Sequence, residues 1–177
     1  ATLDKRIHQF RSKVKKGTNI GKKVSPRWSA RPNVKSRKGS ASDSTKDPYQ
    51  EASELVRAGD LDGALVKLHE KLEEDPDFVP TYYTLGKVYA NKGNLEEAEQ
   101  WCQRAIGRDK LQPEPYYTLS MIYQEHGLLD KAVEVLKKTV YLDRDFVLAH
   151  YNLGQIYQQQ GCSRLAQRSF CNARRLL

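Results

Sequence analysis

The feature that most constrains the fold of this chain is an internal repeat with a period of 34 residues. Glycines recur at this spacing, and an alanine follows each of them five residues later. The glycines are Gly59, Gly93, Gly127 and Gly161, and the alanines are Ala64, Ala98, Ala132 and Ala166. A fixed period in this range is typical of a solenoid, in which each unit buries its apolar face only against its neighbours.

Each unit has the pattern of two helices joined by a glycine turn. In the second unit, the residues that mark one face of the first helix are Tyr82, Leu85, Gly86 and Tyr89. Gly93 predicts the end of this helix, because glycine readily adopts the left-handed conformation found there. The residues that share one face of the following helix are Leu95, Ala98, Cys102 and Ala105. Gly86 and Ala98 are small, which lets the two helices approach closely.

The links between units carry turn and helix-start signals. Turn residues occur in "DPDF" at 75–78 and in "DRDF" at 143–146, while Pro113 and Pro115 suit a helix start. We therefore expect an all-α domain built from four helix pairs. The expected repeats lie at about 45–78, 79–112, 113–146 and 147–177.

A 34-residue unit with small residues in these columns resembles the tetratricopeptide repeat. The resemblance covers about 45–177 and implies a right-handed solenoid of helix-turn-helix repeats. The first unit departs from the family pattern, because Pro48, Glu51 and Lys71 stand where the family usually has an aromatic residue, Leu and Ala. We interpret it as a degenerate end unit.

The resemblance also implies a binding surface. In this family the first helix of each pair lines a concave groove, and its residues that are not used for packing face a partner. The groove residues expected here are Tyr49, Tyr83, Thr84, Lys87, Asn91, Tyr117, Thr118, Met121, Glu125, Tyr151, Asn152, Gln155 and Gln159. This set is aromatic, rich in amides and nearly neutral, which suits a peptide segment or a partner domain. The alternative is that tyrosine is common in this column and that the groove is unoccupied.

One family subtype is not expected. Chaperone-binding members hold a C-terminal carboxylate with a clamp of Lys, Asn and Arg. The matching positions here hold Tyr49, Ser53, Thr84, Glu114 and Thr118. The basic residues are missing and one position has become acidic, so the sequence disfavours a carboxylate ligand.

The end of the chain shows a second resemblance. The stretches "YLDRDFVLAHYNLG" and "AQRSFCNARRLL", both within 141–177, resemble the C-terminal end of bacterial chemotaxis methyltransferases of the CheR type that carry a tetratricopeptide tail. Arg144 replaces the proline that is usual in that family. The resemblance implies a regulatory region whose partner is a signalling protein, such as a chemoreceptor or a methyltransferase domain.

No catalytic domain accompanies this resemblance. No glycine-rich cofactor turn is present, and the four histidines His8, His69, His126 and His150 are scattered along the chain. Cys102, Cys162 and Cys171 form no CxxC pair, which disfavours a zinc site or a disulfide framework. We therefore expect no enzymatic activity, no cofactor and no metal from this chain.

The last helix carries an apolar stripe of Leu165, Phe170, Leu176 and Leu177. A repeat array usually ends in a polar capping helix, so this stripe predicts an exposed end that packs on another domain or subunit, for example in a homodimer. The alternative is a frayed end without a partner.

The charge of the chain is unevenly distributed. Residues 1–44 carry 13 Lys or Arg against two acidic residues, whereas 45–177 carry 17 basic and 20 acidic residues. The composition of 17–44 predicts disorder, and apolar residues at helical spacing within 3–16 fit a short basic amphipathic helix. Three interpretations remain: a linker, a segment that docks on an acidic protein or anionic membrane, and a nucleic-acid binder with few stacking aromatic residues.

The sequence shows neither the pattern of a secretory signal nor that of a membrane-spanning helix. The first residues lack the apolar core of a secretory signal, and no apolar run approaches the length of about 18 residues that a membrane-spanning helix needs. We expect a cytoplasmic protein.

Overall fold

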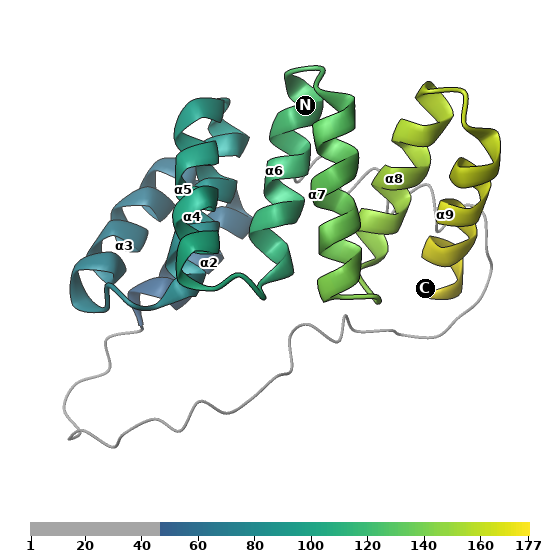
Figure 1. Cartoon of the computed structure of the whole chain (residues 1–177). Helices are drawn as coiled ribbons and strands as arrows, with labels where there is room; N and C mark the ends of the chain where they lie inside the picture. The colour runs from purple at the N-terminus through teal and green to yellow at the C-terminus, as the bar shows by residue number, and fades with distance from the viewer. Residues whose placement is uncertain (1–46) are drawn as a thin grey trace.

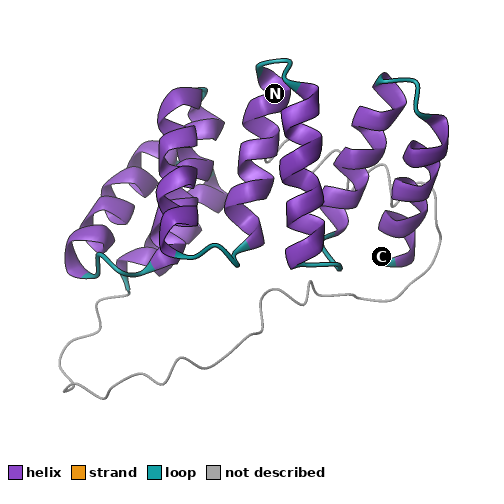
Figure 2. Cartoon of the chain, viewed as in Figure 1, coloured by secondary structure: helices purple, strands orange, loops and turns teal. Residues whose placement is uncertain are grey.

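The computed structural model describes residues 47–177, and within this part of the chain all regular structure is α-helical. The helices are α2 (Pro48–Ala58), α3 (Leu61–Glu74), α4 (Val79–Lys92), α5 (Leu95–Arg108), α6 (Pro113–Glu125), α7 (Leu129–Leu142), α8 (Val147–Gln159) and α9 (Ser163–Arg175). They form four consecutive pairs that follow one another in a row (Figures 1 and 2). The predicted all-α solenoid is confirmed. The expected basic segment at 1–44 and its helix at 3–16 lie outside the described residues.

The glycine turns form as the repeat predicts. Gly59, Gly93, Gly127 and Gly161 all have positive φ angles, between 72° and 89°. This left-handed conformation is strained for residues with a side chain, so glycine at this point of each unit fixes the turn between the two helices of a pair.

The links between units are held by aspartates. Asp75 Oδ1 accepts a hydrogen bond from the backbone N–H of Asp77 at 3.2 Å, and Asp143 Oδ1 accepts one from Asp145 at 3.0 Å. Pro113 begins α6, where its missing N–H costs no intrahelical hydrogen bond. These turns place each new pair directly beside the one before it.

Within a pair, a small residue of the first helix faces a larger residue of the second. A Cβ atom added to Gly86 would lie 2.6 Å from Cys102 Sγ and 3.2 Å from the carbonyl oxygen of Ala98. A Cβ atom on Gly154 would lie 2.6 Å from the ring of Phe170. The predicted close approach of the two helices is therefore confirmed.

Between pairs, each first helix packs on the second helix of the preceding unit. Leu85 and Val88 of α4 share an apolar cluster with Ala64 and Leu68 of α3. The same columns form the next two clusters. These join Leu119 and Ile122 with Ala98 and Cys102, and Leu153 and Ile156 with Ala132 and Leu136. The core is thus a series of nearest-neighbour contacts along the array.

Candidate functional site

The first helices carry a column of tyrosines, Tyr49, Tyr83, Tyr117 and Tyr151, and hydrogen bonds from this column join α2 to α4 and α6 to α8. Helix α4 packs against α6. The hydroxyl of Tyr49 lies 3.3 Å from Thr84 Oγ1, and Asn152 Nδ2 donates to the hydroxyl of Tyr117 at 3.3 Å. Each bond links a residue to the residue 35 positions later. The first helices therefore form one layer, which we call the first-helix face.

The structure divides the predicted groove residues into two groups. Those that remain half-buried or exposed are Tyr49, Tyr83, Lys87, Glu125, Tyr151, Gln155 and Gln159. Those that are buried are Thr84, Asn91, Tyr117, Thr118, Met121 and Asn152. The second group differs from the expectation that these side chains are free of packing.

The buried group holds neighbouring units together. Asn152 Nδ2 approaches Met121 Sδ at 3.1 Å in addition to the hydroxyl of Tyr117. Thr118 Oγ1 donates to the carbonyl oxygen of Glu114, one turn earlier in α6, at 3.1 Å. The sequence of a single unit does not reveal these contacts, since most of them join residues from two units.

The accessible group is mostly uncharged, with three tyrosines and two glutamines beside one lysine and one glutamate. Gln155 Nε2 donates to the hydroxyl of Tyr151 at 3.4 Å, and the Tyr151 ring packs against Phe170 with 5.6 Å between ring centroids. Burial raises the pKa of the Tyr83 hydroxyl, and the charges of Tyr49 and Glu114 add to the effect. Tyr83 therefore stays protonated across the physiological pH range.

Glu114 is a polar residue of this region that the predicted groove set did not include. It lies in the first turn of α6, and its Oε2 atom is buried without a hydrogen-bond partner. Burial raises the pKa of its carboxyl group, and the charge of Asp143 raises it further. A second carboxylate brought here by a ligand would meet like charge, in agreement with the disfavoured carboxylate clamp. The only sequence feature that could have indicated this role of Glu114 is its place at one of the positions that match the carboxylate clamp.

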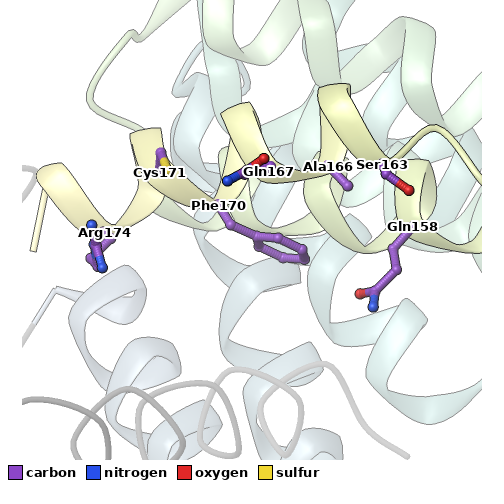
Figure 3. A pocket seen from close by; sticks show the side chains of 7 residues that line it. All are labelled: Gln158, Ser163, Ala166, Gln167, Phe170, Cys171 and Arg174. Atoms are coloured by element: carbon purple, nitrogen blue, oxygen red, sulfur yellow. The ribbon is translucent and has the colours of Figure 1, made fainter.

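A separate pocket lies at the end of the array between α8 and α9. Its volume is about 340 Å³, and its lining includes Gln158 of α8 together with Ala166, Gln167, Phe170 and Arg174 of α9 (Figure 3). Of the predicted exposed end, Phe170 lines this pocket and is half-buried, and Leu176 is half-buried as well. Leu165 is 45% exposed and Leu177 49% exposed, and neither of them lines the pocket.

Cys102 is the buried one of the three cysteines, and Cys162 and Cys171 are exposed. Burial raises the pKa of the Cys102 thiol to about 12, so it packs as a protonated, unreactive side chain. Across 47–177, no three His, Cys, Asp or Glu residues are grouped so that they could hold a metal ion. None of the helices described there is long and apolar enough to span a bilayer.

Comparisons with known proteins agree with this architecture. Residues 55–122 match the family described as tetratricopeptide repeat, and residues 121–161 match a second family described as TPR repeat. A search of curated proteins found no match.

Solved structures provide a fold-level comparison. A crystal structure of MamA is 25% identical, with a TM-score of 0.64 over 73% of this chain and 75% of that chain. The thermophilic TPR protein TTC0263 of Thermus thermophilus is 23% identical, with a TM-score of 0.65 over 73% of this chain and 72% of that chain. An O-GlcNAc transferase mutant of Thermobaculum terrenum is 22% identical, with a TM-score of 0.59 over 65% of this chain and only 23% of that chain.

These neighbours share the stacked helix pairs described above. The two family matches together span residues 55–161, which is more than half of the chain. Residues 55–161 therefore carry tetratricopeptide repeats.

Proposed function

We propose that this protein is a recognition module that binds a segment or a domain of a partner protein on its first-helix face. The observation that supports the proposal is the tyrosine column, of which Tyr49, Tyr83 and Tyr151 remain partly accessible in one layer of helices. Tyrosine offers a large contact area with few torsions to immobilise, and its hydroxyl can pair with the backbone of a bound segment. We assign no catalytic activity to the chain.

The chemistry of this face favours a ligand that donates hydrogen bonds or carries positive charge near α6. Glu114 has an unsatisfied carboxylate oxygen, and the amide of Gln155 provides a neutral polar group farther along the array. A ligand amide or ammonium group near Glu114 would offset the cost of its burial, whereas a C-terminal carboxylate would increase it.

A finer proposal concerns the biological setting. The resemblance of 141–177 to the tails of CheR-type chemotaxis methyltransferases supports a role as the regulatory region of such an enzyme. The partner is then a chemoreceptor or a methyltransferase domain. Binding of the purified chain to those two proteins from the same host tests this setting separately from the first-helix face.

The charge of 1–44 favours a second candidate function, which is electrostatic binding to nucleic acid or to an anionic membrane. This segment carries a net charge of +11, from 13 basic and two acidic residues. Such binding weakens steeply as salt concentration rises. Deletion of 1–44 abolishes this activity and leaves partner binding by the helix array intact.

The test of the main proposal is a pull-down from extracts of the native host. The full chain serves as bait beside a Tyr83→Ala/Lys87→Ala variant and a Tyr141→Ala control. Tyr83 and Lys87 lie on α4, whereas Tyr141 is 82% exposed on the second helix α7. We expect a partner that the control retains and the double variant loses. A partner retained equally by all three baits contradicts the proposal.

A further inference from the structure

The pocket between α8 and α9 occupies the position where each earlier unit holds the next helix. In the third unit, Ala132 and Leu136 of α7 share a cluster with Leu153 of α8. Ala166 and Phe170 of α9 stand 34 residues after Ala132 and Leu136 and line the pocket. The pocket is therefore the fourth copy of a surface that binds a helix three times within this chain.

The residues equivalent to Phe170 in the earlier units are more deeply buried than Phe170 itself, so the surface in the last unit is only partly covered. Leu68, Cys102 and Leu136 are 0% exposed, because the next first helix covers each of them. Phe170 in the same column is only half-buried, although its ring packs on Gly154. Among the described residues, no helix covers its outer edge, which faces the pocket (Figure 3). The floor of the pocket thus offers apolar surface that an additional helix would bury.

The rim of the pocket is basic where the earlier units are apolar. The residues equivalent to Arg174 in the earlier units are Leu72, Ile106 and Val140. Each of them packs against one of the three apolar clusters. The helix α9 carries four arginines and no acidic residue. Arg174 is exposed. An occupant that covers it needs negative charge beside it, because an arginine removed from water is stabilised by a carboxylate partner.

The pocket lining also includes a polar residue whose equivalent in an earlier unit is polar as well. Gln167 is in the column of Glu99, which accepts a hydrogen bond at 3.1 Å from the hydroxyl of Tyr123 on the next first helix. A polar side chain in this column is thus compatible with a helix packed above it.

We propose that this pocket binds one amphipathic, acidic helix of a partner protein. Two apolar residues three positions apart, as Leu85 and Val88 are in α4, would cover Ala166 and Phe170. Each link between units places the first turn of a helix beside the last turn of the helix before it. Arg174 lies in the last turn of α9, so an acidic residue in the first turn of the partner helix would pair with it. This site is separate from the first-helix face and does not depend on it.

A second copy of the chain fits the pocket poorly. In its α2, Glu51 and Glu54 stand in the columns of Leu85 and Val88, and Glu51 is already paired with Lys67 at 3.3 Å. Pairing of two α9 helices would bring arginines together. The amphipathic segment at 3–16 carries six basic residues against one acidic residue, so it shares the charge of α9. An acidic helix of a partner protein has the charge that complements α9.

The probes for the test are two helix-stabilised peptides with the α8 sequence "VLAHYNLGQIYQQ", which is the helix that packs on the equivalent surface of α7. One peptide has glutamate at the positions of Val147 and Leu148, and the other has lysine at both. Binding of each fluorescent peptide to the full chain is measured by anisotropy. We expect the glutamate peptide to bind at least about tenfold more tightly, a factor typical of one close charge pair.

Charge reversal locates the site. The variant Arg174→Glu is expected to reverse the order of the two peptides. The control Arg164→Glu changes an exposed arginine of the same helix outside the pocket lining and is expected to preserve the order. Circular dichroism verifies that both variants fold.

Four results would overturn the proposal: no binding of either peptide, equal binding of both, reversal by Arg164→Glu as well, or retention of the order in Arg174→Glu. Sedimentation of the full chain tests whether a second copy of the chain occupies the pocket. Self-association that Arg174→Glu abolishes would assign the pocket to a second copy and refute the acidic partner.

Discussion

At the scale of single residues, two glycines inside helices set how closely the helices of a pair approach. Gly86 and Gly154 leave no room for a Cβ atom, because Cys102 and Phe170 occupy that space. Their functional importance is indirect, since the spacing within each pair determines where the first-helix face lies. The turn glycines have a different role, which is to adopt positive φ angles.

Substitution of Gly86 tests this packing. We expect Gly86→Ala to lower the free energy of unfolding by about 1–3 kcal/mol, as overpacking of a well-packed interior does. Gly107→Ala is the matched control, because nothing lies within 4 Å of its added Cβ atom, and it should raise stability by about 0.5–1 kcal/mol. Urea denaturation measures both values, and equal effects of the two substitutions would refute the account.

The carboxyl group of Glu114 provides a pH test. Its pKa is raised in the folded protein, first by burial and then by Asp143, so the folded state holds the proton more tightly than the unfolded chain does. The free energy of unfolding therefore falls as pH rises from the ordinary carboxyl range through the raised pKa. We expect Glu114→Gln to be more stable than the parent protein at pH 7.

This advantage should shrink as pH falls through the raised pKa, because the parent carboxyl then becomes neutral as well. Urea denaturation at pH 7 and at pH 4 measures the difference between the two proteins. A glutamine variant that is less stable at pH 7, or an advantage that grows at pH 4, is incompatible with the burial of this carboxylate.

At the scale of the helix, an equivalent ring side chain fastens each of α4, α6 and α8 to the link before it. The hydroxyl of Tyr82 donates to the carbonyl oxygen of Pro76 at 2.6 Å, and that of Tyr116 donates to the carbonyl oxygen of Lys110 at 3.3 Å. His150 takes the same place in the fourth unit, with Nε2 3.0 Å from the carbonyl oxygen of Arg144. His150 is buried, as Tyr82 and Tyr116 are.

Removal of one hydroxyl group tests this attachment. We expect Tyr82→Phe to lower the free energy of unfolding by about 0.5–1.5 kcal/mol, the usual net contribution of one hydrogen bond. Tyr141→Phe is the control, because Tyr141 is largely exposed on α7. Thermal unfolding should distinguish the two variants, and an unchanged Tyr82→Phe would mean that water replaces the bond.

The helix pairs could be predicted from the sequence because local features specify them. Gly93 ends a helix through its own backbone conformation. The close contact of Gly86 with Cys102 could be predicted as well, because both residues belong to the same unit. The burial of Asn152 and Thr84 could not be predicted, because their partners Tyr117 and Tyr49 lie 35 residues away in the preceding unit. A face projected from one unit therefore overestimates how many of its residues a partner can reach.

At the scale of the whole molecule, the array has no central core and depends on contacts between neighbours. The three apolar clusters join the first unit to the second, the second to the third and the third to the fourth. Within residues 47–177, inner units therefore have two covered sides, whereas the first and last units have one. Stability in such an array is a sum of unit and neighbour contributions.

Hydrogen exchange tests this distribution. We expect the backbone amides of α4 to α7 to exchange more slowly than those of α2 and α9, because opening an end unit breaks only one interface. Mass spectrometry of peptides from the exchanged protein measures the order. Uniform protection along the array would indicate a single cooperative unit instead. A peptide bound in the end pocket should slow exchange in α9 selectively.

The measurement that tests the central claim most directly is side-chain oxidation by hydroxyl radicals, with the protein alone and in complex with its captured partner. Tyr83 and Tyr151 report on the first-helix face, and Tyr141, on a second helix, serves as the internal control. We predict that the partner protects Tyr83 and Tyr151 from oxidation while Tyr141 reacts as before. Unchanged oxidation of Tyr83 and Tyr151 in the complex would contradict recognition through the first-helix face.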